Sequence, residues 1–387
     1  MKAKKIIQII LPICLFAAIL VMVVVLALNG KKKEAPEPSS IPVVIPETTE
    51  PETFPEWYTG NKNPLTGIMD LPDEAVGKKP VAVMINNVID AMPQYGIEDA
   101  DIMFEIPVES DLTRMMAIFP DYKALKDICS VRSCRYYFPA MAAGFDALYI
   151  HWGLDVTIAD YLYSLDIPKY DLNAEFYQGN LAGRDQDRLD KGYLLEHTSV
   201  FHGKQLPKFL KQDGVKMKIK KKRAGDAFKF TDSEEPINPS KKSCTKVEIN
   251  FGGQSTQFKY DPETKTYKKK NCGKKQIDEK TGNQLAFTNL FVLETEIWIR
   301  EDGYHKGVDW NGGKKAKGYY ISNGYIREIR WSKKDEYSKL KILTKKGNEV
   351  AVNKGKSYIA MTYPGSATFK GKKTQDAAAE PSAENNP

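Results

Sequence analysis

The stretch CSVRSCRYYFPAMAAGFDALYIHWG, residues Cys129 to Gly153, contains the pattern of a strand, a short helix and a second strand. Ile128 to Val131 is a short apolar run, and so is Ala147 to His151, which predicts two strands. Between them, Pro139 to Gly144 favours a short helix, because proline is accepted in a first helical turn and glycine at a helix end. We therefore expect a mixed sheet with helices.

Further strands are predicted on both sides of this stretch. Val81 to Ile85 has the pattern of a buried strand, while Asp101 to Ile106 and Thr113 to Phe119 form a hairpin-connected pair. After a basic segment rich in turn residues, 216–243, short β-prone runs follow one another, separated by Gly, Asn and Asp-Pro turns. These runs are 247–251, 256–260, 266–269, 290–299, 318–321, 325–331, 340–344 and 357–361. Their spacing favours an antiparallel sheet or a small barrel.

The predicted fold class is α+β: an N-terminal membrane helix, a mixed α/β sheet domain, and a smaller antiparallel β-rich domain. A chain of 387 residues exceeds one ordinary domain, which agrees with two folded units. The predicted parts are a cytoplasmic tail (1–5), a transmembrane anchor (6–28), a Pro/Glu-rich linker (29–60), an N-terminal α/β domain (61–215), a β-rich C-terminal domain (216–370) and a disordered tail (371–387).

The N-terminal apolar run decides the predicted location. Residues 6–28 contain Gln8 as their one strongly polar member and are long enough to span a bilayer. A cleaved signal peptide is the alternative, but its apolar region is about 7 to 15 residues long. Ile13 stands before Cys14, where a lipoprotein signal needs a small residue. We expect a single-pass protein of the cell membrane with most of the chain outside the cytoplasm.

Four cysteines lie beyond the predicted anchor. Cys129 with Cys134, and Cys244 with Cys272, are each close enough in sequence for a local disulfide outside the cell. Free thiols that serve as small apolar residues are the other possibility. No metal-ligand spacing, cofactor motif or Cys-His pair suited to catalysis is present in the sequence.

The order of several short motifs resembles the YerB-like family of bacterial envelope lipoproteins. The motifs are Pro64-Leu-Thr-Gly67, Pro80-Val-Ala-Val-Met-Ile-Asn-Asn87, Pro93-Gln94, Ala100-Asp101 followed by Glu105, Thr113-Arg114, Val131-Arg-Ser-Cys-Arg135, Tyr149-Ile-His151, GYIREIRWSK from Gly324 to Lys333, and Gly355-Lys-Ser-Tyr358. The resemblance implies a two-domain extracytoplasmic protein on a membrane anchor. This chain departs from it in lacking a lipid-attachment motif, and in having Glu196-His197-Thr198 where relatives tend to have Pro-His-Asn.

A candidate ligand site is predicted around the opening stretch. Arg132 and Arg135 follow a strand and precede a helix, where free backbone N–H groups and guanidinium forks suit phosphate or carboxylate. The candidate ligand-binding residues are Arg114, Arg132, Ser133, Arg135, His151, Glu105, Asp101, Asp146 and His197. The alternative is a set of structural ion pairs, for example between Arg114 and Glu105 across the hairpin.

Charge suggests a second surface. The formal net charge is +7, and residues 204–280 contain 21 Lys and Arg against 10 Asp and Glu. The densest points are Lys220 to Arg223 and Lys268 to Lys270. No nucleic-acid signature accompanies them, so we expect a cell-wall polyanion or lipid headgroups as partners and no nucleic acid. A solvated basic face is the alternative.

Three function classes follow from these patterns. The first is a non-enzymatic envelope protein that binds an anionic ligand or a partner protein through the Arg132 and Arg135 loop and the basic region. The second is a phosphotransferase or hydrolase acting on a pyrophosphate-linked wall precursor, because the layout loosely resembles wall-polymer ligases of the LytR-CpsA-Psr type. In it, Asp101 or Asp146 would bind metal or act as a base. The third is a structural or regulatory adaptor for a membrane protein.

Overall fold

The computed structural model describes residues 61–371. The chain divides into two units, 1–51 and 52–387, and everything described here belongs to the second. The predicted tail, anchor and linker (1–60) lie outside the described residues, as does all but one residue of the predicted C-terminal tail. Within the described part, no helix is long and apolar enough to cross a membrane.

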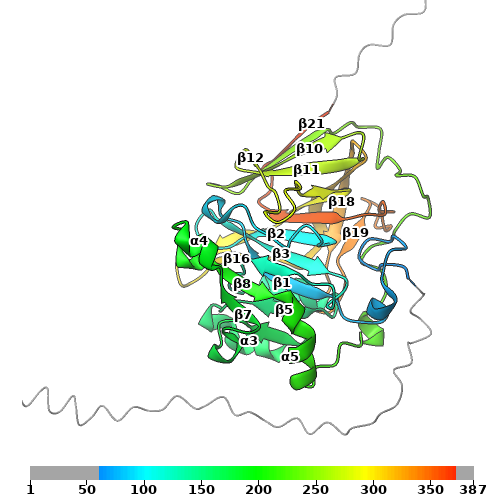
Figure 1. The fold of residues 1–387 in the computed structure, drawn as a ribbon. Coiled ribbons are helices and arrows are strands. Elements are labelled where there is room, and N and C mark those ends of the chain that lie inside the picture. The colour runs from blue at the N-terminus through cyan, green and yellow to red at the C-terminus, as the bar shows by residue number, and fades with distance from the viewer. Residues whose placement is uncertain (1–60, 372–387) are drawn as a thin grey trace, which may run out of the picture. The chain divides into compact units, whose positions relative to one another are not determined.

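A mixed sheet of ten strands forms the centre of the described unit (Figure 1). Its order is β19-β18-β17-β14-β20-β2-β3-β1-β5-β6. The strands are β1 (Val81–Asn86), β2 (Ile102–Pro107), β3 (Thr113–Phe119), β5 (Leu148–His151), β6 (Lys169–Asp171), β14 (Asn289–Glu294), β17 (Gly312–Ser322), β18 (Tyr325–Ser332), β19 (Lys341–Leu343) and β20 (Ser357–Thr362). The β2-β3 hairpin and the parallel pair β1-β5 confirm the mixed sheet predicted from the opening stretch.

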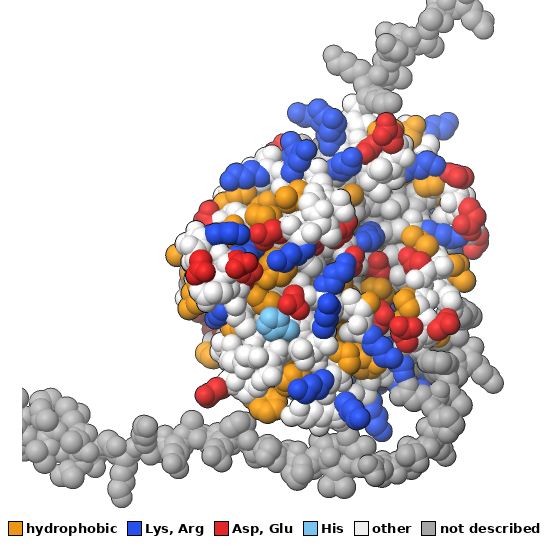
Figure 2. All heavy atoms as spheres, viewed as in Figure 1, with side chains coloured by type: hydrophobic (Ala, Val, Ile, Leu, Met, Phe, Trp, Pro, Cys, Tyr) orange, Lys and Arg blue, Asp and Glu red, His pale blue; other side chains and the backbone are white. Residues whose placement is uncertain are grey.

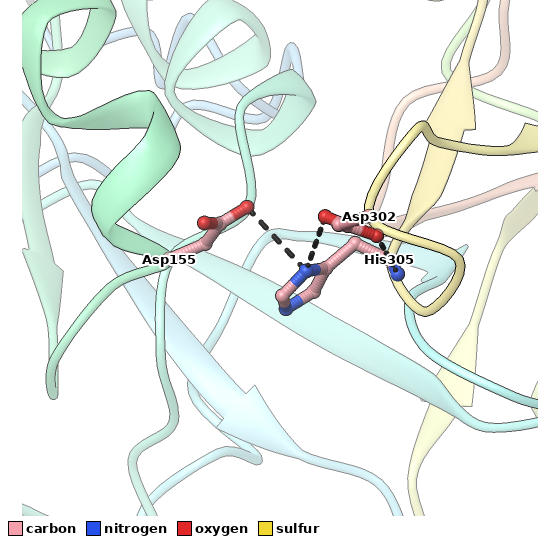
Figure 3. Close-up of side chains that lie close together, drawn as sticks. All are labelled: Asp155, Asp302 and His305. Carbon is pink, nitrogen blue, oxygen red and sulfur yellow. Dashed lines mark hydrogen bonds and ion pairs between the residues drawn. The ribbon is translucent and has the colours of Figure 1, made fainter.

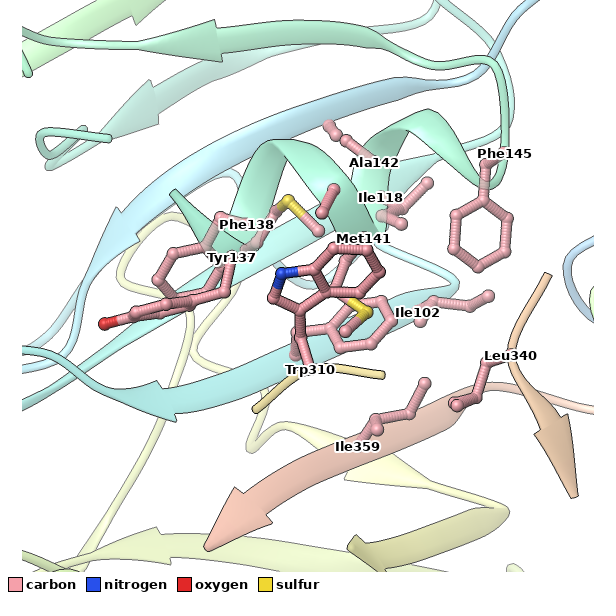
Figure 4. Packing of buried hydrophobic residues seen from close by; sticks show 14 of the residues in the cluster. Ile102, Ile118, Tyr137, Phe138, Met141, Ala142, Phe145, Trp310, Leu340 and Ile359 are labelled. Carbon is pink, nitrogen blue, oxygen red and sulfur yellow. The ribbon is translucent and has the colours of Figure 1, made fainter. Parts of the chain in front are cut away.

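The central strands are buried along their whole length. Every residue of β1, β2, β3 and β20 is buried, which explains why these segments appear in the sequence as apolar runs instead of alternating ones. Helix α2 (Tyr137–Ala143) lies between β4 (Asp127–Cys129) and β5 in the chain, and all its residues are buried. Figure 4 shows its Tyr137, Phe138 and Met141 beside Trp310 and Ile359.

The remaining helices are short. They are α3 (Ala159–Ser164), α4 (Gln186–Asp190) and α5 (Leu206–Gln212), together with the 3-10 turns η1 (Asp73–Ala75), η2 (Ile89–Ala91), η3 (Val156–Ile158), η4 (Glu175–Tyr177), η5 (Leu195–His197), η6 (Gly203–Gln205) and η7 (Lys221–Arg223). A three-stranded sheet has the order β4 (Asp127–Cys129), β8 (Ser199–His202) and β7 (Ala182–Arg184).

A smaller antiparallel sheet follows in the order β12-β11-β10-β9-β21, with β13 also paired to β11. Its strands are β9 (Lys246–Asn250), β10 (Ser255–Asp261), β11 (Thr266–Asn271), β12 (Lys274–Lys275), β13 (Ala286–Phe287) and β21 (Ala367–Lys370). Residues of β9 are alternately exposed and buried, so one face of this sheet packs on the core and the other faces solvent.

The strands predicted for the second region divide between the two sheets. Strands β9 to β13 and β21 form the small sheet, whereas β14 and β17 to β20 extend the large sheet, where β20 pairs in parallel with both β2 and β14. Each of the two main apolar clusters draws residues from both regions. The large sheet contains strands from both sides of residues 215 and 216. The domain boundary expected there stays a prediction.

One predicted strand is broken. The run 290–299 ends as β14 at Glu294 and resumes as β15 (Ile297–Ile299), which pairs with β16 (Lys306–Val308) in a separate hairpin. Thr295 lies at the break, where its amide donates to the carbonyl of Thr362 and its hydroxyl to the carbonyl of Asp309. The first bond is the last ladder bond between β14 and β20, and the second joins Thr295 to the segment that follows β16.

Candidate functional site

Two of the predicted arginines share one buried carboxylate. Arg114 Nη2 pairs with Glu109 Oε1, while Arg135 Nη2 lies 2.9 Å from Glu109 Oε2. The remaining donors are used as well, since Arg114 Nη1 donates to the carbonyl of Ser133 at 2.8 Å and Arg135 Nη1 to that of Cys134 at 2.7 Å. Arg114, Arg135 and Glu109 are all buried. These guanidinium groups are therefore structural in this arrangement.

Burial and the adjacent charge of Arg135 lower the pKa of Arg114 to about 9. The predicted pair between Arg114 and Glu105 is wrong. Arg114 stands opposite Ile106 in the hairpin and Glu105 stands opposite Met115, so the two side chains project from opposite faces of the sheet.

Arg132 and His197 lie on either side of Glu196. Arg132 Nη1 donates to the carbonyl of Glu196 at 3.2 Å and lies 3.7 Å from its carboxylate. His197 Nδ1 lies 3.0 Å from Asn86 Nδ2, and burial lowers the pKa of this imidazole. The Arg132 side chain is partly exposed, at 21%. Arg132 is thus the member of the predicted arginine set that retains access to solvent.

His151, Asp101 and Asp146 lie in three separate places. His151 Nδ1 is 2.9 Å from the carbonyl of Gly153, and burial lowers the pKa of its ring. Asp101 accepts from Asn63 at 2.7 Å. Asp146 is fully buried and binds Arg223 at 2.9 Å, the backbone N–H of Lys220 and the ammonium of Lys79.

The hydrolase alternative requires a carboxylate beside an arginine that holds phosphate. Within residues 61–371, neither Asp101 nor Asp146 shares a hydrogen-bond or ion-pair partner with Arg132. The structure therefore does not assemble the residues named for that alternative into one centre.

Glu105 lies in a polar network between the large and small sheets. Its carboxylate accepts from Asn87 at 2.7 Å, from Thr113 and Thr256 at 2.8 Å, and from the hydroxyl of Tyr358. The network continues to Lys269 of β11, which is fully buried and donates to Gln276 at 2.6 Å and Thr256 at 3.3 Å. The motifs containing Asn87, Glu105, Thr113 and Tyr358 therefore meet here, and they join the two sheets.

The four cysteines described are free thiols. Cys129, Cys134 and Cys244 are buried, and Cys272 is exposed. Burial raises the pKa of the Cys129 thiol to about 12. Of the two possibilities left by the sequence, this structure has the unpaired one.

An acidic cluster with one histidine lies on the β15-β16 hairpin (Figure 3). His305 Nδ1 is 2.9 Å from Asp302 and 3.6 Å from Asp155. Backbone N–H groups of Tyr304 and His305 hold the pKa of Asp302 well below its usual range. Because Arg300 already binds the Asp155 carboxylate at 2.6 Å, the cluster is an ion-pair network that fastens the hairpin to η3.

The solvent face of the small sheet is rich in lysine, and we call it the lysine face. Its outward positions on β9, β10, β11 and β21 are Lys246, Glu248, Asn250, Ser255, Gln257, Lys259, Asp261, Thr266, Lys268, Lys270, Thr368 and Lys370. Figure 2 shows Lys and Arg side chains gathered over the end of the molecule where Figure 1 places β10, β11 and β12.

Four of these lysines stand in register across four strands. Lys370 of β21 is opposite Lys246 of β9, Lys246 is opposite Lys259 of β10, and Lys259 is opposite Lys268 of β11. We call this set the lysine row. All four side chains are exposed. Asp261 binds Lys268 at 2.6 Å, whereas the other three ammonium groups have no acidic partner within the described chain.

The sequence indicated a basic region but not this row. The run Lys268 to Lys270 was predicted as one dense basic point, yet Lys269 points inward to the Glu105 network while its neighbours face solvent. The period-2 alternation of the strands was a usable signal for which lysines face outward. The register that aligns them depends on strand pairing and could not be found in the sequence alone.

The fold and this site define a mixed α/β protein with a basic antiparallel sheet appended to it. Residues 65–216 match the family described as protein of unknown function (DUF3048), N-terminal domain, and residues 247–359 match the C-terminal domain of that family. The chain belongs to this family.

Two comparisons agree with the family match. The chain is 27% identical over 292 residues to the Bacillus subtilis (strain 168) protein named "Putative lipoprotein YerB", with 72% of this chain and 80% of the relative covered. The crystal structure of YerB protein from Bacillus subtilis superposes with a TM-score of 0.68 at 25% identity, covering 80% of this chain and 99% of that one. The resemblance to the YerB-like family is confirmed.

Proposed function

We propose that this chain is a membrane-associated protein of the cell envelope that binds an anionic ligand on the lysine face. The named relative is described as a lipoprotein, which supports a place at a membrane. In this chain the apolar run 6–28 would provide the attachment as a single spanning helix, with the described unit outside the cytoplasm. The ligand would be a polyanion of the wall or of the membrane surface.

The lysine row is the observation that supports binding. Neighbouring strands lie about 4.8 Å apart, and like charges directly opposite one another in a sheet destabilise it. In water, two unit charges about 5 Å apart repel by roughly 0.8 kcal/mol. Three successive Lys–Lys pairs therefore oppose folding slightly, and an anion lying on them would remove that repulsion.

The arginine loop is the weaker candidate for this role. Arg114 and Arg135 are held by Glu109, so an incoming anion would have to displace a buried carboxylate. Arg132 is more accessible but already donates to the carbonyl of Glu196. The lysine row needs no such exchange at Lys246, Lys259 or Lys370.

The composition of the lysine face also disfavours single-stranded nucleic acid as the ligand. Platforms for single strands combine basic residues with aromatic side chains on which bases stack. The outward residues of β9, β10, β11 and β21 include no aromatic side chain. The face offers charge and hydroxyl or amide groups, which suits a ligand recognised by its charge.

The test is calorimetric titration of the purified full chain with long-chain inorganic polyphosphate. If about four charges are neutralised on a linear polyanion, affinity should fall roughly 50-fold between 50 and 200 mM salt. An Arg132→Gln variant should bind within about twofold of the unchanged chain. Absence of binding at low salt, or a dissociation constant that does not change with salt, would contradict the proposal.

A further inference from the structure

We infer that the ligand of the lysine face is a linear polymer with repeating phosphate groups that lies along the lysine row, across the strands of the small sheet. This inference rests on the proposed function, and it adds the shape, the direction and the chemistry of the ligand. A flat anionic membrane surface is the competing occupant.

On β21, β9 and β10 the positive charge forms a stripe one residue wide, and on β11 it widens to include Lys270 beside Lys268. Along a strand, the next outward residue lies two positions away, about 7 Å from the row. On one side that position is Glu248 of β9, which accepts from Gln257 at 3.4 Å. On the other side it is Asp261 of β10, which binds Lys268. Carboxylates therefore stand on both sides of the stripe.

This arrangement favours a linear polymer over a flat anionic surface as the ligand. A flat anionic surface laid on the face would meet Glu248 and Asp261 together with the lysines, and the like charges would oppose its approach. A chain lying along the row would meet Lys370, Lys246 and Lys259 in turn. Its charges would remain about 7 Å from the carboxylates and closer to the ammonium groups of the row, so attraction to the lysines would exceed repulsion from the carboxylates.

The surface is also hollowed beside this line. A groove of about 360 Å³ is lined by Lys246, Lys259 and Lys370 of the row, and by Glu248, Gln257, Lys270 and Thr368 of the neighbouring outward line. One end of the row lies on β21, the last strand in the order of the small sheet. A polymer could therefore enter over that edge and continue across β9 and β10.

The type of basic residue is compatible with phosphate as the ligand group. Arginine presents a planar fork that matches carboxylate and phosphate bidentately, whereas the lysine ammonium binds phosphate as a point charge with three rotatable donors. Between Arg223 and Arg300 the sequence contains no arginine, although lysines are frequent there. A row built from lysine alone suits phosphate groups that present oxygens in several directions.

The length of the row sets a length for the ligand. Four strands span three spacings, or roughly 14 Å. A polymer needs enough successive charges to cover that distance. The affinity for one lysine row should therefore rise with polymer length until the polymer covers the row, and then stay constant.

The test compares two double variants of the full chain that remove equal charge from the same sheet. Lys246→Gln with Lys259→Gln removes the middle of the row. Lys274→Gln with Lys275→Gln removes two exposed lysines of β12, outside the row and the groove. The probes are triphosphate, long-chain inorganic polyphosphate, polyglutamate of similar length, and vesicles containing anionic phospholipid.

The inference predicts that the row variant loses polyphosphate affinity at least tenfold, while the β12 variant loses less than threefold. Long polyphosphate should bind at least tenfold more tightly than triphosphate, and more tightly than polyglutamate or vesicles. Equal losses in both variants, or tightest binding to vesicles or polyglutamate, would overturn the inference while leaving anion binding in place. Absence of binding to every probe would instead overturn the proposed function.

Discussion

At the scale of single residues, burial decides what each predicted site residue does. Glu109 forms ion pairs with two guanidinium groups that the sequence presented as open to a ligand. Removing one partner from such a buried group is strongly destabilising. Arg132 differs from Arg114 and Arg135 in two respects, since its side chain is partly exposed and it contacts Glu196 instead of Glu109.

Asp101 gives a pH dependence that can be measured. Burial raises the pKa of its carboxyl from 3.8 to about 6, with the hydrogen bond from Asn63 opposing the shift. Between pH 4 and 6 the folded chain keeps this proton while the unfolded chain has lost it. Stability therefore falls as pH rises through that window, by up to roughly 3 kcal/mol.

Asp101→Asn should abolish this fall, because the amide does not titrate and can still accept from Asn63. Urea unfolding at pH 4 and pH 7 measures the effect, and the variant should gain stability relative to the unchanged chain as pH rises. Asp99→Asn, at an exposed neighbouring position, is the control. If the free energies of unfolding of Asp101→Asn and of the unchanged chain differ by the same amount at pH 4 and at pH 7, Asp101 does not titrate as described.

The types of residue in the candidate site could be predicted from the sequence, but their partners could not. Arg132 and Arg135 were found by their position after a strand, and Arg114 by its position on a neighbouring strand. Arg114 and Arg135 both form ion pairs with Glu109. The partner of Arg114 was misplaced because the prediction took Glu105 on the opposite strand, whereas the partner is Glu109, which is nearer in sequence and lies beyond the end of β2.

At the scale of elements, the small sheet shows how register produces a property that no single strand has. Each of β9, β10 and β21 contributes one lysine to the row, which is unremarkable in any of these sequences alone. Pairing places the lysines opposite one another. The same pairing turns Lys269 of β11 inward, where it binds Gln276 in the Glu105 network.

Lys259→Gln should stabilise the folded chain, because it removes the lysine that stands between Lys246 and Lys268. The expected gain is about 0.5 kcal/mol at low salt. It should shrink in 0.5 M salt, where the Debye length is about 4 Å. Urea unfolding at both salt concentrations, with Lys274→Gln as the matched control, gives the comparison. A loss of stability in Lys259→Gln at low salt would mean that the lysine side chains of the row do not repel one another in the folded chain.

Element positions followed from local pattern more reliably than element partners. The runs that became β1, β2, β3 and β5 were apolar because both their faces are covered, and the sequence located them within a few residues. The run 290–299 is divided because 289–294 pairs with β17 and β20, whereas 297–299 pairs with β16, and none of these partners can be identified from the run itself. Contacts between residues so far apart in the chain cannot be predicted from the local sequence pattern.

At the scale of the whole molecule, the two matched family regions share one sheet and two apolar clusters. The large sheet and the Glu105 network hold the small sheet in place, with its lysine face outward. Two regions with different sequence patterns thus form one described unit. The sequence predicted both patterns, while the pairing of β20 with β2 that unites them came from the structure.

The central claim is that the lysine row is the binding surface, and lysine acetylation mapped by mass spectrometry tests it most directly. The full chain is treated with acetic anhydride with and without long-chain inorganic polyphosphate. Protection is predicted at Lys246, Lys259 and Lys370, while Lys221 and Lys222 of η7 stay as reactive as before. Protection centred on η7, or equal reactivity at every lysine with and without polyphosphate, would contradict the account.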